Sequence, residues 1–164
     1  MSLYVDTYNV LTHKKLKLEQ EIKQDKFKSE YRKLVINLLF TGGWMEQKIT
    51  QILKPNGITL QQFNILRILK GQNPEPSSVN LLIDRMLDKM SNASRIVDKL
   101  EKKNLVTRTI CKNDRRAVDV KITDKGLALL KKLEVHESRN EKKFDTLSNP
   151  EIKILNNLLD KLRG

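Results

Sequence analysis

The residue types that could do chemistry in this chain of 164 residues are concentrated between positions 91 and 103. Wound as a helix, the stretch places four apolar residues on one core-facing stripe, namely Ala93, Ile96, Val97 and Leu100. The opposite face carries Ser91, Arg95, Asp98 and Lys102, flanked by Asn92, Ser94 and Lys99. Short hydrogen-bonding groups followed by cations are what a helix needs to enter a DNA major groove. We therefore predict a helix over 91–103 with an outer face suited to nucleic acid.

The residues before this helix predict a second helix. A second apolar stripe at the same spacing predicts a helix over 79–87, and it consists of Val79, Leu82, Ile83 and Met86. Only residues 88–90 separate the two predicted helices, which is the length and order of a helix-turn-helix. Asn104 then stands where a left-handed C-cap is expected, and asparagine tolerates that backbone well.

The segment after Asn104 predicts a two-stranded hairpin. Residues 106–111 are rich in β-branched side chains, and residues 118–122 alternate between apolar and polar. The connection between them is too polar to be buried and carries Asp114, Arg115 and Arg116. A hairpin that directly follows a helix-turn-helix makes a winged helix-turn-helix, with the wing at 106–122.

The chain upstream of the helix-turn-helix is expected to be helical. Residues 3–33 contain neither glycine nor proline and predict a solvent-exposed helix, intact or broken. Residues 34–53 are more apolar, and the pair Gly42–Gly43 indicates a kink or a close approach of another helix. After a turn at 55–57, the sequence Thr59–Gln62 is a capping box that starts another helix. Residues 71–78 are dense in turn formers and predict a loop closed by a serine cap.

The carboxyl-terminal part predicts two more helices. One starts at Thr123–Gly126, and the other starts at the capping box Ser148–Glu151. The last helix has an apolar face formed by Ile152, Leu155, Leu158, Leu159 and Leu162. This apolar surface exceeds what a small winged domain can cover, so pairing with a second copy is the simplest way to bury it.

These elements together predict a mainly α chain with a small β-hairpin wing. We expect residues 1–33 to form an amino-terminal helical extension and residues 57–123 to form the winged helix-turn-helix domain. Residues 34–56 and 124–163 are expected to be dimerisation helices on either side of it.

Charge favours a polyanionic partner. Lys and Arg outnumber Asp and Glu by 32 to 20, a formal net charge of +12, and residues 85–116 alone carry ten basic and four acidic side chains. Nucleic acid is the leading candidate, and an anionic membrane surface is the second. No apolar run is long enough to span a bilayer, and the start of the chain lacks the features of a signal peptide. The single cysteine, Cys111, fits a reducing cytoplasm.

Enzymatic function finds little support. His13 and His136 are isolated in polar stretches, no Cys or His pair has the spacing of metal ligands, and no glycine-rich phosphate loop occurs. We expect neither a metal nor a cofactor. Cys111 is interpreted as a half-buried strand residue, with a sensor role as the alternative. We expect three larger residues to make contacts in the core or in a dimer, namely Phe40, Trp44 and Met45. The alternative is that they line a ligand pocket.

The order and spacing of these motifs resemble the MarR-type transcription regulators. The likeness is strongest over residues 94–108, over Asp114–Arg116 and over residues 120–126, and a weaker likeness extends it to about 34–163. Asn104 replaces the glycine that is usual in the family, but it meets the same backbone need. Cys111 lies on a wing strand, away from the amino-terminal position of the reactive cysteine in the family's peroxide sensors, which argues against a thiol switch.

The resemblance implies a triangular homodimer, acting as a repressor, whose winged domains straddle a pseudo-palindromic operator in double-stranded DNA. Asn92, Ser94 and Arg95 would face bases or nearby phosphates, and Lys99 and Lys102 supply further cations on the same helix. Three more contacts are implied at the wing: Arg116 in the minor groove, Asp114 orienting it, and Arg115 on a phosphate. The family's effectors are small, often aromatic or phenolic molecules bound between the dimerisation helices and the winged domain; no residue here identifies one.

The alternative from another functional class is a winged-helix protein-interaction module whose basic face docks an acidic partner. Such a surface has no special need for the Asp114–Arg116 triplet beside a short polar helix face. Competition of the partner by duplex DNA would separate the two hypotheses.

Overall fold

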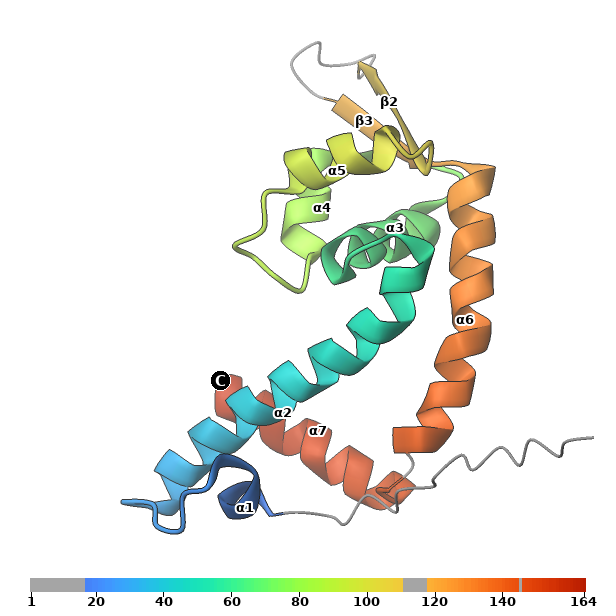
Figure 1. Ribbon diagram of the computed structural model, residues 1–164. Coiled ribbons are helices and arrows are strands. Elements are labelled where there is room, and N and C mark those ends of the chain that lie inside the picture. Colours follow the sequence, from blue (N-terminus) through green and yellow to red (C-terminus); the bar gives the residue numbers. More distant parts are fainter. Residues whose placement is uncertain (1–16, 111–117, 145) are drawn as a thin grey trace, which may run out of the picture. The chain divides into compact units, whose positions relative to one another are not determined.

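The computed structural model describes residues 17–110, 118–144 and 146–164, and it describes no side chains over 135–144. The chain divides into two compact units, Met1–Met45 and Glu46–Gly164. The helices and strands of both units are drawn in Figure 1. The long helix α2 (Glu30–Leu53) begins in the first unit and ends in the second.

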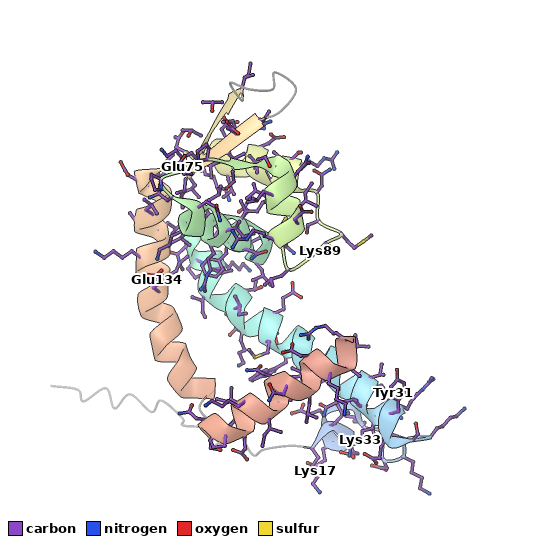
Figure 2. The ribbon with its side chains drawn as sticks, turned by 180° about the vertical axis from the view of Figure 1, so that it is seen from behind. Lys17, Tyr31, Lys33, Glu75, Lys89 and Glu134 are labelled. Carbon is purple, nitrogen blue, oxygen red and sulfur yellow. The ribbon has the colours of Figure 1, made fainter. Side chains whose placement is uncertain are left out.

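The described part of the first unit is a short helix folded back on the start of α2. The short helix α1 (Leu18–Ile22) ends at Lys23, whose left-handed backbone (φ 54°) forms its C-cap. The Lys33 ammonium on α2 lies 2.6 Å from the Glu19 carboxylate on α1 and 6.0 Å from the centroid of the Phe27 ring. Lys17 and Lys33 are labelled in Figure 2. The predicted exposed helix is therefore broken between Lys23 and Glu30, and its residues 3–16 lie outside the described part.

Helix α2 runs through Gly42–Gly43 as one helix, so the two glycines do not interrupt it. Within the described part of the first unit, a Cβ added to either glycine would meet no atom within 4 Å. The helix ends as expected: a 3-10 turn covers Lys54–Asn56, and Gly57 follows with φ 68°.

The second unit is built around helix α3 (Leu60–Gln72). The predicted capping box starts this helix, because the Thr59 hydroxyl accepts from the Gln62 N–H and the Gln62 side chain accepts from the Thr59 N–H, both at 3.3 Å. Helix α3 contacts α4 (Val79–Arg85), α5 (Ala93–Glu101) and α6 (Asp124–Phe144). Side chains from all these helices are fully buried in one core, including Leu66, Leu82, Val97, Leu100 and Leu130.

A three-stranded antiparallel sheet in the order β1-β3-β2 completes the winged unit. Strands β2 (Val106–Ile110) and β3 (Val118–Ile122) form the predicted hairpin, with Val106 opposite Ile122 and Ile110 opposite Val118. Strand β1 (Ser77–Ser78) pairs with β3 and was not predicted. Ser78 then provides the predicted serine cap of α4 by accepting from the Leu81 N–H at 3.2 Å.

Helices α4 and α5 are both shorter than predicted. Helix α4 ends at Arg85 and not at 87, because Met86 has extended backbone (ψ 141°) while its side chain stays in the core. The connection between α4 and α5 therefore spans residues 86–92 and is longer than predicted. Helix α5 covers Ala93–Glu101, within the predicted 91–103, with Asn92 as its N-cap and Lys102 as its C-cap. Asn104 has the expected left-handed backbone, with φ 58°.

The base of the hairpin is fixed to the start of α6. The Thr123 hydroxyl donates to the Asn104 carbonyl at 2.8 Å and accepts from the Gly126 N–H at 3.1 Å. The Thr123 N–H in turn donates to the Leu105 carbonyl at 3.1 Å. Gly126 is buried in this corner, and a Cβ on it would lie 2.4 Å from the Leu105 carbonyl oxygen.

The last helix, α7 (Asn149–Arg163), starts at the predicted capping box, where the Ser148 N–H donates to the Glu151 carboxylate at 2.7 Å. Five of its apolar residues remain exposed in the single chain, namely Ile152, Ile154, Leu155, Leu158 and Leu162, whereas Leu159 is partly buried. Exposed apolar residues also follow the course of α2, among them Leu34, Leu39, Phe40 and Trp44. The fold is thus mainly α with a small β-sheet, as predicted.

Candidate nucleic-acid interface

Helix α5 presents a continuous polar and cationic face to solvent. Ala93, Val97 and Leu100 are buried on its inner side. The residues predicted to contact DNA from this helix are all exposed, namely Asn92, Ser94, Arg95, Lys99 and Lys102. The Asn92 carboxamide oxygen accepts from the Arg95 N–H at 3.0 Å and caps the helix. Asn92 is predicted to contact DNA, but its only side-chain oxygen is therefore already used to cap the helix.

The connection before α5 is held by hydrogen bonds to the rest of the domain and within itself. The Leu87 N–H donates to the Asn64 carboxamide oxygen on α3 at 2.9 Å. The Asp88 carboxylate accepts from the Ser91 hydroxyl at 2.6 Å and from the Met90 N–H at 3.0 Å. These two hydrogen bonds lower the pKa of Asp88, so its carboxylate stays ionised to a lower pH than that of an ordinary aspartate.

Helix α5 is also joined to strand β2 of the wing. The Arg108 guanidinium on β2 pairs with Asp98 on α5 and lies 3.9 Å from Glu101 one turn further on. The three side chains are partly exposed, so solvent screening leaves this cluster a small effect on stability. The cluster joins β2 directly to α5 through side chains. It also neutralises the acidic group on the outer face of the helix.

The carboxyl-terminal end of α5 is joined to the corner between α2 and α3. The Lys103 ammonium donates to the Gln62 carboxamide oxygen at 3.0 Å and to the Gly57 carbonyl oxygen. Gln62 is a buried polar residue, only 3% exposed, and this contact helps to satisfy it. Lys103 is therefore a structural cation, in contrast to Lys99 and Lys102.

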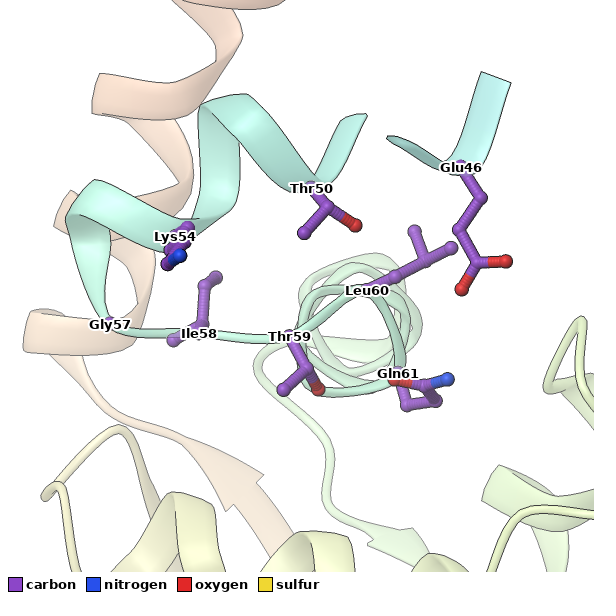
Figure 3. Close-up of a pocket in the computed structure, with 8 residues that line it drawn as sticks. All are labelled: Glu46, Thr50, Lys54, Gly57, Ile58, Thr59, Leu60 and Gln61. Carbon is purple, nitrogen blue, oxygen red and sulfur yellow. The ribbon is translucent and has the colours of Figure 1, made fainter. Parts of the chain in front are cut away.

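Two shallow hollows flank this region. The first, of about 250 Å³, lies between the first turn of α3 and α5, and its lining includes Gln61, Arg95 and Lys99. The second, of about 310 Å³, lies where the end of α2 meets the start of α3. Figure 3 shows the side chains that line the second hollow, with the Glu46 carboxylate reaching toward it from α2. Ile58 and Leu60 add apolar surface to it.

Several residues that shape this interface escaped prediction. Asn64 accepts a hydrogen bond from Leu87, 23 residues along the chain, and Arg108 donates to Asp98, 10 residues away. Local sequence patterns do not reveal contacts over such separations. The predicted wing-tip residues Asp114, Arg115 and Arg116 lie outside the described residues, as does Cys111. Among the described residues, no group of three or more His, Cys, Asp or Glu side chains could hold a metal ion. No helix in the described ranges is long and apolar enough to cross a membrane.

Two core-packed helices joined by a turn and followed by a hairpin define a winged helix-turn-helix domain. A family model described as "MarR family" matches residues 58–118. A MarR transcription factor from Planctomyces limnophilus is 30% identical over 82% of this chain and 98% of that chain, with a TM-score of 0.62. The chain belongs to the MarR family.

Two other solved structures share the fold. A mutant MarR from E. coli complexed with operator DNA is 23% identical over 84% of this chain and 99% of that chain, with a TM-score of 0.73. The organohalide-sensing RdhR transcriptional regulator in its 2,4-dichlorophenol-bound form is 22% identical and covers 98% of this chain and 88% of that chain, with a TM-score of 0.71.

Proposed function

We propose that this protein is a sequence-specific regulator of transcription that binds double-stranded DNA through α5 and the wing. The observation that carries the proposal is the exposed row Asn92, Ser94, Arg95, Lys99 and Lys102 on a helix whose flanking residues Leu87 and Lys103 are hydrogen-bonded to the rest of the domain. A rigid support for such groups is what base recognition requires. The MarR from E. coli that binds operator DNA has the same fold, which supports the assignment.

Each residue has a proposed role in the complex. Ser94 and Arg95, near the start of α5, read base edges, and Asn92 caps the helix while facing the same groove. Lys99 and Lys102 neutralise phosphates, which makes affinity fall with salt concentration. At the wing, Arg116 enters the minor groove with Asp114 orienting it, and Arg115 contacts a phosphate.

The active form is proposed to be a homodimer in which helices from 34–56 and 124–163 pair with those of a second copy. The support is the apolar surface left open on α2 and α7 of the single chain, where Leu39, Ile154 and Leu158 are each more than half exposed. Two winged domains in one dimer would bind two half-sites of a pseudo-palindromic operator. The dimer would repress by blocking access of polymerase.

A small aromatic effector is proposed to bind in the hollow between α2 and α3 and thereby to release the protein from DNA. The hollow has a volume of about 310 Å³, which is at the lower end of the range for small-molecule pockets. Gly57 lines it and also accepts the hydrogen bond from Lys103 at the end of α5. A ligand that moves this corner would therefore move the recognition helix, and it would act to the extent that it binds the two forms with different affinity. The dichlorophenol-bound relative supports this ligand class.

Selection of bound duplexes from a random DNA pool tests the proposal. We expect an inverted repeat with half-sites about one helical turn apart. Arg95→Ala and Arg116→Ala should each weaken binding of the selected duplex by about 1–3 kcal/mol, whereas Lys132→Ala, an exposed cation on α6, serves as the matched control. Binding that selects no sequence and disappears at moderate salt would overturn the proposal and favour the module that docks an acidic protein.

A further inference from the structure

The connection between α4 and α5 exposes two large apolar side chains. Leu87 is 82% exposed and Met90 is 94% exposed, and Met90 stands two residues before the N-cap of the recognition helix. Among the described residues nothing covers either side chain. Most of the other exposed large apolar residues follow α2 and α7, where a second copy is proposed to cover them; Ile83 on α4 and Ile110 on β2 are exceptions, and both are less exposed than Leu87 and Met90. Leu87 and Met90 lie on neither of these helices and need a different explanation.

The exposure does not come from a loose backbone. Asn64 fixes the Leu87 N–H from α3, and the Asp88 carboxylate binds both the Met90 N–H and the Ser91 hydroxyl. The Lys89 ammonium donates to the Ile83 carbonyl at 3.4 Å, which joins the connection back to α4. Lys89 marks the position of this connection in Figure 2. The two apolar side chains are thus displayed from a fixed support.

The chemistry of the major groove indicates what would meet them. Base edges in this groove offer hydrogen-bond donors and acceptors, and the C5-methyl group of thymine is the main apolar group among them. The connection runs directly into the N-terminal end of α5, whose Ser94 and Arg95 are proposed to read bases. Arg95 and Lys99 nearby provide the positive charge that brings the phosphate backbone close.

We propose that Met90, supported by Leu87, is a specificity-determining residue that contacts thymine methyl groups in each operator half-site. The proposal rests on the function proposed above and adds a base preference to it. Loss of contact with one buried methyl group should weaken binding by about fourfold. Truncation of Met90 should abolish the preference for thymine over uracil at the contacted position, because the two bases differ only by that methyl group.

The test uses the duplex selected by the wild-type protein, with each thymine of one half-site replaced singly by deoxyuridine. We expect one or two replacements to weaken wild-type binding by about fourfold each. Met90→Ala should bind the unmodified duplex more weakly by a similar factor and be insensitive to the same replacements. Met90→Leu should keep the sensitivity, and Leu87→Ala should reduce it. Met90 is almost fully exposed, so thermal melting of the free variants should match the wild type.

The outcomes separate the two proposals. Equal sensitivity of wild type and Met90→Ala to every replacement, or no sensitivity in either, would overturn the role of Met90 while leaving DNA-binding regulation intact. Unchanged DNA affinity of both Met90→Ala and Leu87→Ala would overturn it as well and would assign the pair to a protein partner. If the wild type selects no duplex, DNA-binding regulation fails first and the role of Met90 fails with it.

Discussion

Replacement of Gly126 by alanine gives a sharp test of the packing at the base of the wing. The added Cβ would lie 2.4 Å from the Leu105 carbonyl oxygen and 2.7 Å from Cγ1 of Ile122. The first of these neighbours is backbone, and both lie where β2 and β3 meet the start of α6. Relief of the clash requires α6 to move away from the sheet, although Leu130 and Leu133 on α6 are each only 1% exposed in the core. Overpacking of this kind costs about 1–3 kcal/mol.

A second glycine supplies the matched control. Gly71 is also helical, in α3, and a Cβ on it would meet no described atom within 4 Å. Alanine is preferred over glycine within helices by about 0.5–1 kcal/mol, so Gly71→Ala should stabilise the protein by about that amount. Both variants gain this preference of alanine over glycine, so it largely cancels when their stabilities are compared. Their difference in unfolding free energy should therefore approach the steric cost of about 1–3 kcal/mol.

Urea denaturation followed by circular dichroism measures this difference. All variants should be compared at one protein concentration, because self-association contributes to apparent stability. Gly126→Ala should have the lower midpoint and Gly71→Ala a midpoint above that of the wild type. A Gly126→Ala protein as stable as Gly71→Ala would refute the close packing of α6 against the hairpin.

Three further predictions follow from individual contacts. The buried hydroxyl of Ser77 has no hydrogen-bond partner among the described residues, so Ser77→Ala should leave the melting temperature unchanged or raise it. Asn92→Ala removes the N-cap of α5 and should lower the unfolding free energy by about 1 kcal/mol in urea titrations, whereas Asn92→Asp should retain most of it. The hydrogen bond from Lys70 lowers the pKa of Glu134; its stabilising effect is present above the ordinary value of 4.5 and is lost as the pH falls through the lowered pKa. Melting curves between pH 7 and pH 3 should therefore show a smaller acid-induced loss of stability in Glu134→Gln than in the wild type.

Much of the winged fold could be predicted from local sequence. The stripe of Ala93, Val97 and Leu100, the capping box at Thr59 and the alternation in 118–122 each determine structure over a few residues. Strand β1 was missed because two serines carry no periodicity, and their strand exists only through pairing with β3. The end of α4 was misplaced because Met86 continues the apolar stripe although its backbone is extended. Tertiary packing decided both cases.

The candidate site was predictable only in part for the same reason. The exposed residues of α5 follow from helical geometry, since the buried stripe fixes which side chains face outward. The support for that helix depends on Asn64, Lys103 and Arg108, whose partners are distant in sequence. No local pattern distinguishes Lys103, which is held by Gln62, from Lys102, which is exposed.

The fixed base of the hairpin has a consequence for its motions. Val106 and Ile122, next to Thr123, are almost fully buried, whereas Ile110 at the other end of β2 is 69% exposed. Opening of the two strands should therefore start at the end remote from Thr123, and amide hydrogens near Ile110 should exchange with solvent before those near Val106. Because the base stays joined, the strands can close again only in their original register. Each side chain of the hairpin thus returns to the same face after every opening.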